Sequence, residues 1–260
     1  MKSSKSIVFI NEKGGIGKTS ACFNLGWELS NMGKKVLMID MDGQEANLTF
    51  FCNAPKENIF TMMDILDKKK DTSIKDAIVP IKENLHLIPA NVDVVDIGEA
   101  STKDVLSQLR LMKKSISQMK EVYDYVFIDV SPTPNWSHGL ALSCVDHAIV
   151  IMLPDITSLQ ASNGVIDSIN EVKEDSNPSL SVLGLLLNMS EGRTNLAKEV
   201  TALSDELATN LGTTVFHQKL KRLVAFQECV YAHTGVTDYA PKSEAAIEVK
   251  SLAKELEERA

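Results

Sequence analysis

Eight consecutive residues decide the fold of this 260-residue chain: Lys13, Gly14, Gly15, Ile16, Gly17, Lys18, Thr19 and Ser20. An apolar run at residues 7–10, which predicts a strand, precedes them, and a helical pattern begins at about Ser20. Glycines let backbone N–H groups converge on anionic oxygens, and the helix N-terminus adds a favourable partial charge. A glycine-rich turn between a strand and a helix therefore predicts a phosphate-binding loop.

Two side chains of this loop are typical of nucleotide binding. Lys18 is expected to contact the β- and γ-phosphates, and the hydroxyl of Thr19 is expected to ligate Mg²⁺. Lys13 stands where an ordinary phosphate loop has no special residue. The alternative, a plain surface turn, is disfavoured because the full string directly follows an apolar strand.

The rest of the chain alternates apolar runs with helical patterns. Strands are predicted at residues 7–10, 36–39, 85–88, 126–129, 148–153 and 182–187, with a short one at 214–216. Helices are predicted at about 20–32, 61–68, 104–120, 159–173, 196–211 and 243–258. Nearly continuous apolar strands indicate a sheet that is covered on both faces. The fold class expected is α/β, with a doubly wound, mostly parallel sheet flanked by helices, in a single domain over residues 1–260.

Polar residues follow three of the predicted strands. Asp40 and Asp42 follow the second strand, Asp129 ends the strand at 126–129, and Asn188 follows the strand at 182–187. Ligands of such sheets bind at the carboxyl ends of the strands. Asp129 on its own is also a common turn cap, but beside a phosphate loop it suits a Mg²⁺ carboxylate. Of Asp40 and Asp42, one is expected to face magnesium and the other to orient an attacking water.

Net charge, apolar stretches and cysteine positions exclude several classes of protein. The net charge of −8 excludes a uniformly basic nucleic-acid binder, so any such binding needs a local patch. No stretch approaches the roughly 20 apolar residues of a membrane span, and the first residues are too polar for a secretory signal. The four cysteines are scattered, as expected for reduced thiols and not for a metal site: Cys22, Cys52, Cys144 and Cys229. A cytoplasmic protein is the expectation.

Several stretches resemble the ParA/MinD group of P-loop ATPases. Residues 13–19 (KGGIGKT) resemble its deviant Walker A box, residues 36–44 its second box, and residues 123–129 its Walker B strand. Two further pieces, at residues 84–91 and 193–196, resemble the ParA/Soj branch of partition ATPases. The likeness runs from about residue 5 to residue 258.

The resemblance implies an ATPase with ATP and Mg²⁺ as cofactors and assigns roles to the residues. Lys18 is the P-loop lysine, and Lys13 is the signature lysine that reaches the partner's phosphates across an ATP-sandwich homodimer. Asp42 positions the hydrolytic water. The metal site comprises Thr19, Asp40 and Asp129, and the nucleotide site comprises residues 13–20 with Asn188 at the adenine. A buried Asn188 could equally cap local backbone.

The resemblance also implies partners. A ParA-type dimer binds nucleoid DNA non-specifically and is reset when a ParB-like centromere-binding protein stimulates hydrolysis, which implies a nucleoid-associated location. The DNA-binding candidates are Arg193, Lys219, Lys221 and Arg222, with Lys198 and Lys242 beside them. Ala225 stands where relatives often carry another arginine, and a merely solvated charged face is the alternative for this patch.

Two other functions remain open at this point. A MinD-like regulator of cell division needs a basic amphipathic C-terminal helix to reach a membrane. The polar face of residues 243–259 is mainly acidic, so we expect this helix to pack on the domain and no membrane partner. A nucleotide-dependent positioning ATPase for a protein cargo is the second alternative.

Overall fold

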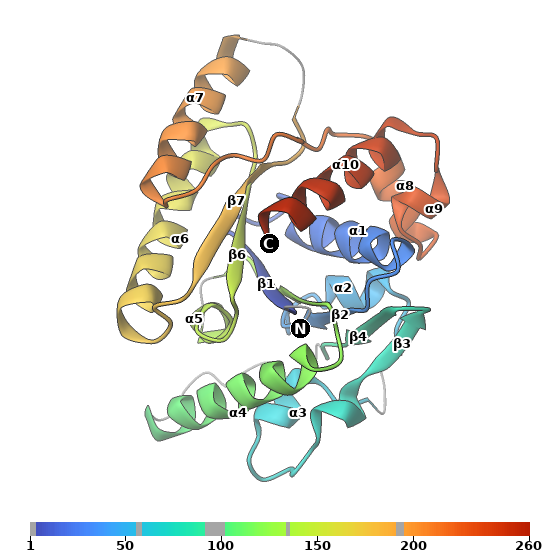
Figure 1. Cartoon of the computed structure of the whole chain (residues 1–260), viewed down its shortest axis with the longest axis vertical. Helices are drawn as coiled ribbons and strands as arrows, with labels where there is room; N and C mark the ends of the chain where they lie inside the picture. Colours follow the sequence, from blue (N-terminus) through green and yellow to red (C-terminus); the bar gives the residue numbers. More distant parts are fainter. Residues whose placement is uncertain (1–3, 56–58, 92–101, 134–135, 191–194) are drawn as a thin grey trace.

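A seven-stranded sheet forms the centre of the computed structural model, which describes residues 4–55, 59–91, 102–133, 136–190 and 195–260. The strand order is β3-β4-β2-β5-β1-β6-β7 (Figure 1). The strands are β1 (Lys5–Ile10), β2 (Val36–Asp40), β3 (Val79–Lys82), β4 (Leu85–Ile88), β5 (Tyr125–Asp129), β6 (His147–Met152) and β7 (Ser181–Leu187).

All neighbouring strands are parallel except the edge pair β3 and β4. The central strands consist almost entirely of buried residues, as parallel strands covered on both faces require. Register pairs Asp129 of β5 with Asp40 of β2 on one side and with Phe9 of β1 on the other. The carboxyl ends of these three strands therefore lie side by side.

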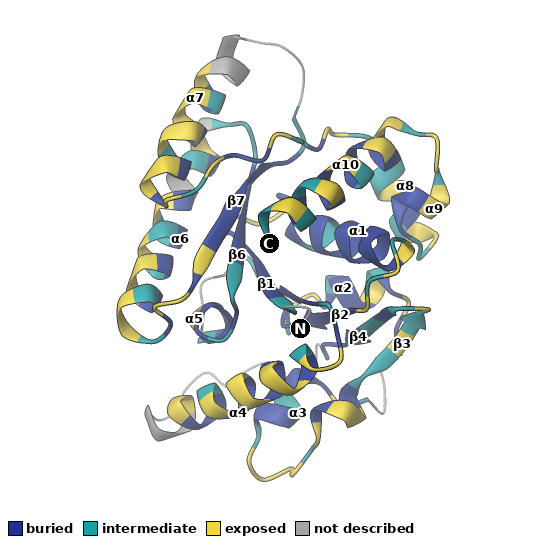
Figure 2. Ribbon diagram, in the orientation of Figure 1, coloured by how far each residue is buried: buried dark blue, intermediate teal, exposed yellow. Residues whose placement is uncertain are grey.

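Helices cover both faces of the sheet, and Figure 2 shows their buried sides turned toward the strands. One apolar core joins the sheet to α1 (Lys18–Asn31), α2 (Asn47–Phe51), α8 (Ala225–Tyr231), α9 (Val236–Tyr239) and α10 (Glu244–Arg259). The other joins it to α3 (Met62–Leu66), α4 (Thr102–Lys120), α5 (Trp136–Leu142), α6 (Ile156–Asp175) and α7 (Asn195–Asn210). A short 3₁₀ helix, η1 (Ile74–Ala77), precedes β3.

The predicted fold class is confirmed, and the six longer predicted strands and all six predicted helices are present. The predicted strand at 214–216 is wrong, because this segment makes only an isolated bridge between Val215 and Leu185. The sequence did not predict α2, α5, α8, α9 or β3, which have four to seven residues each. Elements this short are stabilised by tertiary packing and leave almost no periodic signal.

The C-terminal helix α10 packs on the domain, as the sequence predicted. Its buried residues include Val249, Leu252 and Leu256, which belong to the core beside α1. Within the described ranges, no helix is both long enough and apolar enough to cross a membrane.

Candidate nucleotide-binding site

The glycine-rich loop connects β1 to α1 at the carboxyl edge of the sheet. Gly17 is the N-cap residue of α1 and has a φ of 86° in the left-handed region, which glycine adopts without steric cost. A Cβ at Gly17 would lie 2.1 Å from Nδ2 of Asn188. Glycine is therefore required here by the backbone conformation and by the close neighbour.

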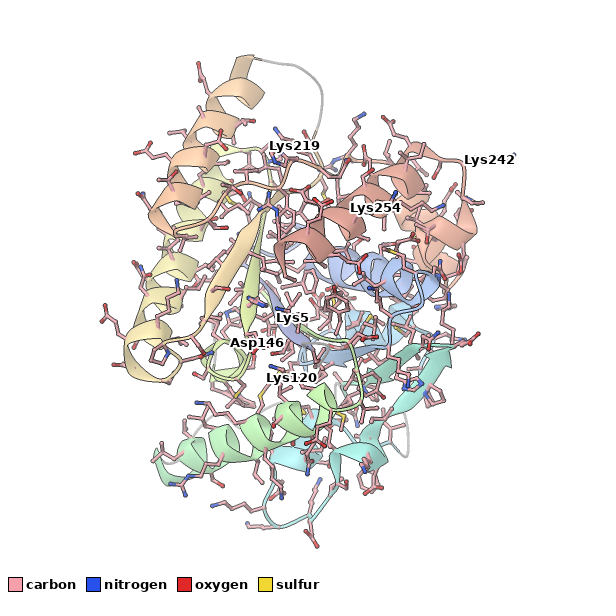
Figure 3. All side chains as sticks on the ribbon, in the orientation of Figure 1. Lys5, Lys120, Asp146, Lys219, Lys242 and Lys254 are labelled. Carbon is pink, nitrogen blue, oxygen red and sulfur yellow. The ribbon has the colours of Figure 1, made fainter. Side chains whose placement is uncertain are left out.

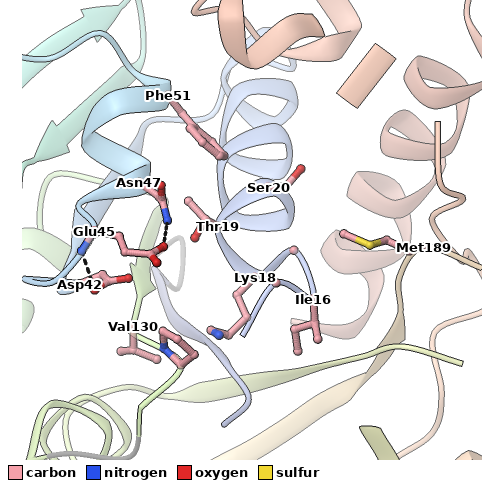
Figure 4. Close-up of a pocket in the computed structure, with 13 residues that line it drawn as sticks. Ile16, Lys18, Thr19, Ser20, Asp42, Glu45, Asn47, Phe51, Val130 and Met189 are labelled. Carbon is pink, nitrogen blue, oxygen red and sulfur yellow. Dashed lines mark hydrogen bonds between the residues drawn. The ribbon is translucent and has the colours of Figure 1, made fainter. Parts of the chain in front are cut away.

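A cavity of about 240 Å³ lies against this loop (Figure 4). It is lined by most of the loop and by residues from α2 and from the segments after β2, β5 and β7: Gly15, Ile16, Gly17, Lys18, Thr19, Ser20, Asp42, Glu45, Asn47, Phe51, Val130, Pro132 and Met189. The structure thus brings together Asp42 and the predicted residues 15–20. The other residues predicted for the nucleotide and metal sites do not line it: Lys13, Gly14, Asp40, Asp129 and Asn188.

Lys18 lies at the base of the cavity and is 95% buried, with 5% of its surface exposed. Its Nζ donates a hydrogen bond to the carbonyl oxygen of Lys13 at 3.3 Å. Burial lowers the pKa of Lys18, whereas the nearby carboxylates of Asp129, Asp42 and Glu45 act in the opposite direction. A desolvated ammonium among carboxylates is a ready partner for phosphate oxygens.

Asp129 supplies the test of whether the site fits a magnesium ion. Its carboxylate is fully buried, and neither oxygen has a hydrogen-bond partner of ordinary geometry in the described part of the chain. Burial and the charge of Asp40 raise its pKa well above the usual range, although Thr19 and Lys18 are close enough to oppose this. A bound cation would compensate both the desolvation and the missing partners. Asp129 and Thr19 therefore fit a Mg²⁺ site.

Asp40 has different surroundings. Its Oδ2 accepts hydrogen bonds from the backbone N–H and the hydroxyl of Thr49 at 2.8 and 2.7 Å, and its Oδ1 accepts one from the N–H of Asp42 at 3.0 Å. Burial nevertheless raises its pKa to about 6. These bonds connect β2 to α2, so Asp40 positions the segment that carries Asp42. A contact between Asp40 and the magnesium ion stays a prediction.

Asp42 organises the turn that follows β2. Its Oδ1 accepts hydrogen bonds from the N–H groups of Gln44 at 3.0 Å and Glu45 at 3.3 Å. The chain then passes through Ala46 in the left-handed region, with φ of 48°, and enters α2. Figure 4 shows Asp42 and Glu45 on the side of the cavity opposite Met189.

Lys13 turns away from the cavity. Its Nζ contacts both carboxylate oxygens of Asp155 at 3.1 and 3.2 Å and donates to the hydroxyl of Thr157 at 2.7 Å. About 27% of its side chain is exposed. In this arrangement the ammonium belongs to the surface beside the phosphate loop and not to the lining of the loop's own cavity.

Asn188 braces the loop. Its Nδ2 donates to the carbonyl oxygen of Ile16 at 2.7 Å, and its Oδ1 accepts from the N–H of Met189 at 2.9 Å. These bonds correspond to the structural alternative for this residue, and a contact with adenine stays a prediction. The neighbouring Met189 is the residue from this segment that lines the cavity.

The sequence missed several residues of the site. Glu45, Asn47 and Phe51 belong to or precede the short helix α2, for which no periodic signal exists. Asp155 carried a usable signal, since it follows the carboxyl end of the strand predicted at 148–153.

Three of the four predicted DNA-binding residues lie on the segment before α8: Lys219, Lys221 and Arg222. Lys221 pairs with Glu244 and with Glu248 of α10, and Nζ of Lys219 donates to the hydroxyl of Thr201 at 3.2 Å. Arg222 is exposed next to them. Arg193 lies outside the described residues.

Comparison with known proteins agrees with this geometry. The model of a family described as AAA domain (AAA_31) matches residues 4–182. An uncharacterised protein of Mycobacterium tuberculosis is 30% identical over 98% of this chain and 79% of its own length. The chromosome-partitioning ATPase Soj of Treponema pallidum is 28% identical over 97% of this chain and 96% of its own.

Solved structures show the same fold. The septum site-determining protein MinD of Pyrococcus horikoshii, complexed with Mg-ADP, superposes with a TM-score of 0.75 and 23% identity, and the match covers 99% of each chain. This likeness shows the fold alone. The family match and the full-length similarity to Soj confirm the group that residues 13–19 predicted. The chain belongs to the AAA domain family and is a P-loop ATPase of the ParA/MinD group.

Proposed function

We propose that this ATPase is a partition switch. Mg-ATP drives a sandwich homodimer, the dimer binds nucleoid DNA non-specifically, and hydrolysis stimulated by a ParB-like centromere-binding protein resets it. The observation that carries the proposal is the position of Lys13, a lysine of the phosphate loop whose ammonium lies outside the loop's own cavity. A full-length relative described as a chromosome-partitioning ATPase supports the biological role.

The residues around the cavity would have separate roles in the binding and hydrolysis of Mg-ATP. Lys18 and the backbone N–H groups of the loop would bind the phosphates, while Thr19 and Asp129 would hold the magnesium. The metal, when bound, neutralises charge that develops on the phosphate oxygens. Asp42 would orient the water, because it lines the cavity and is itself fixed by the turn after β2.

Lys13 would link nucleotide binding to dimerisation. The ammonium of Lys13 lies at the surface beside one cavity, where it can reach the phosphates of a nucleotide bound to a second subunit. The negative charge of those phosphates then gains this partner only in the dimer. In the single chain, Asp155 and Thr157 hold the same ammonium. The cis contact with Asp155 therefore competes with the contact in trans.

Asp155→Asn is expected to strengthen ATP-dependent dimerisation. The variant removes the charge that holds Lys13 but keeps an oxygen for the N–H of Ser158, which Asp155 caps at 2.7 Å. Exposed ion pairs contribute at most about 1 kcal/mol, so the dimer dissociation constant should fall by no more than about fivefold. Sedimentation velocity over a concentration series with Mg-ATP measures this change.

Asp64→Asn is the matched control for that experiment, because it weakens an ion pair with Lys70 on another part of the surface. This control should dimerise like the wild type. A weaker dimer for Asp155→Asn would contradict a competing cis contact and would mean that Asp155 helps dimerisation.

The DNA contact would involve the basic residues around α10. Figure 3 labels Lys219 close to α10, Lys254 on this helix, and Lys242 on the connection that leads into it. Lys221 lies in the same region, but Glu244 and Glu248 already match its charge. This surface therefore carries less uncompensated positive charge than the number of lysines in the sequence implied.

Lys219→Ala is expected to weaken DNA binding severalfold, whereas Lys221→Ala should have a smaller effect, because Glu244 and Glu248 pair with Lys221. A residue that neutralises a phosphate releases a counterion, so its loss should also reduce the salt slope by about 1. Fluorescence anisotropy with a random-sequence duplex, in ATP and at several salt concentrations, measures both quantities. Equal losses for Lys221→Ala and Lys219→Ala would contradict this assignment.

The proposal as a whole is tested by measuring oligomeric state and DNA affinity with Mg-ATP, Mg-ADP and no nucleotide. A dimer and salt-sensitive DNA binding are expected with Mg-ATP alone. A nucleotide-dependent dimer without DNA affinity would contradict the partition role and favour the positioning of a protein cargo.

A further inference from the structure

His138 is a buried histidine close to the nucleotide site that the proposed mechanism does not use. It lies on α5 with 4% of its surface exposed. Its Nε2 is 2.6 Å from the carbonyl oxygen of Ser131. Since a carbonyl oxygen only accepts, Nε2 must carry the proton and donate it.

The bond fixes the segment that leaves β5 at Asp129. Val130 and Pro132, on either side of Ser131, both line the nucleotide cavity. Pro132 also packs on the phosphate loop, because a Cβ placed on Gly14 would lie 3.7 Å from Cβ of Pro132. The hydrogen bond from His138 therefore fixes the segment at residues 130–132, which forms part of the cavity lining.

The imidazole of His138 can donate this hydrogen bond without carrying a charge. Burial lowers the pKa of His138, and the charge of Lys18 lowers it further, whereas the hydrogen bond to Ser131 and the charge of Asp42 act in the opposite direction. The ring is accordingly neutral and donates a hydrogen bond without adding charge beside the phosphates. A buried polar ring without such a bond would cost free energy, so the bond also accounts for its place in an apolar helix.

We propose that His138 is a positioning residue of the nucleotide site: its Nε2–H holds the carbonyl of Ser131 and so keeps Pro132 and Asp129 in place around the phosphates and the metal. This inference rests on the proposed function, because it assumes that the cavity binds Mg-ATP. It adds a residue outside the phosphate loop, on a helix that the sequence did not predict.

The test compares two replacements in the full chain. His138→Leu removes the donor, and His138→Gln restores one, because the glutamine amide nitrogen corresponds to Nε2 of histidine. We expect Mg-ATP affinity, measured by titration with a fluorescent ATP analogue, to fall about tenfold in His138→Leu, the loss that a hydrogen bond of about 1.4 kcal/mol produces. His138→Gln should recover most of it. Thermal unfolding of both variants is measured alongside.

His147→Leu is the matched control. His147 also bonds through a ring nitrogen, to Oγ of Ser181 at 2.6 Å, but at the opposite end of the sheet. It should bind Mg-ATP like the wild type. If His138→Leu does not fold, His138→Asn replaces it, because the shorter asparagine places its amide near Nδ1 and cannot reach Ser131.

Three outcomes decide the matter. Reduced affinity in His138→Leu with recovery in His138→Gln supports the positioning role. Unchanged affinity in His138→Leu, or equal losses in the two variants, overturns it. A wild type that binds no Mg-ATP overturns the proposed function itself, which separates the two failures.

Discussion

Lys18→Ala is expected to weaken Mg-ATP binding by about 100-fold and to abolish ATP-dependent dimerisation. The Lys18 side chain lines the cavity and is almost fully buried, so no other cation of the loop can take its place there without a rearrangement of the chain. Hydrogen bonds to charged groups contribute about 1.5 to 3 kcal/mol, and a loss of about 2.7 kcal/mol corresponds to a factor of 100. Titration with a fluorescent ATP analogue measures the affinity, and sedimentation velocity measures the dimer.

Lys254→Ala controls for the removal of a lysine as such, since Lys254 is exposed on α10 away from the cavity. This variant should bind Mg-ATP normally. Thermal unfolding separates a lost contact from a lost fold, because Lys18→Ala also removes a positive charge near Asp129. A dimer of normal strength in a folded Lys18→Ala variant would remove Lys18 from the site.

The phosphate loop was predictable from the sequence because its function requires particular residues at fixed spacing. Of the predicted residues 13–20, residues 15–20 line the cavity, and Asp42 and Asp129 lie at the carboxyl edge of the sheet, where the strand-end rule expects ligands. These are local consequences of glycine conformation and of parallel-strand geometry. The fold class followed from the apolar runs in the same way.

The parts that the sequence did not predict depend on contacts between distant segments. Phe51 lines the cavity because α2 packs on α1. The bond of His138 to Ser131 spans only seven residues, but it depends on the short helix α5, which leaves almost no periodic signal. The partners of Lys13, at the start of α6, are 142 and 144 residues away in the sequence. The hydrogen bond of Asn188 to Ile16 spans 172 residues. No periodicity or composition encodes such pairings.

We expect a replacement of Asp42 to affect ATP hydrolysis more than nucleotide binding. Its carboxylate lines the cavity and also caps the turn before α2, so its replacement changes both a charge and a local structure. Asparagine keeps an oxygen for the two backbone N–H groups, whereas alanine removes it. The pair of variants Asp42→Asn and Asp42→Ala therefore separates the negative charge from the cap.

Both Asp42 variants are expected to hydrolyse ATP at least about 100-fold more slowly and to accumulate as ATP-bound dimers, because a positioned carboxylate that assists a water typically contributes 10² to 10⁴ in rate. Mg-ATP affinity should not fall, since the change removes a negative charge close to the phosphates. Phosphate release in the presence of the stimulating ParB-like protein measures the rate of ATP hydrolysis. Sedimentation velocity with Mg-ATP measures the fraction of dimer. Asp67→Asn, which changes a similar backbone-capping aspartate elsewhere, should behave like the wild type. If Asp42→Asn hydrolyses ATP like the wild type and only Asp42→Ala is defective, the role of Asp42 is to hold the turn before α2. Another carboxylate of the cavity would then orient the water, and Glu45 is the nearest one in sequence.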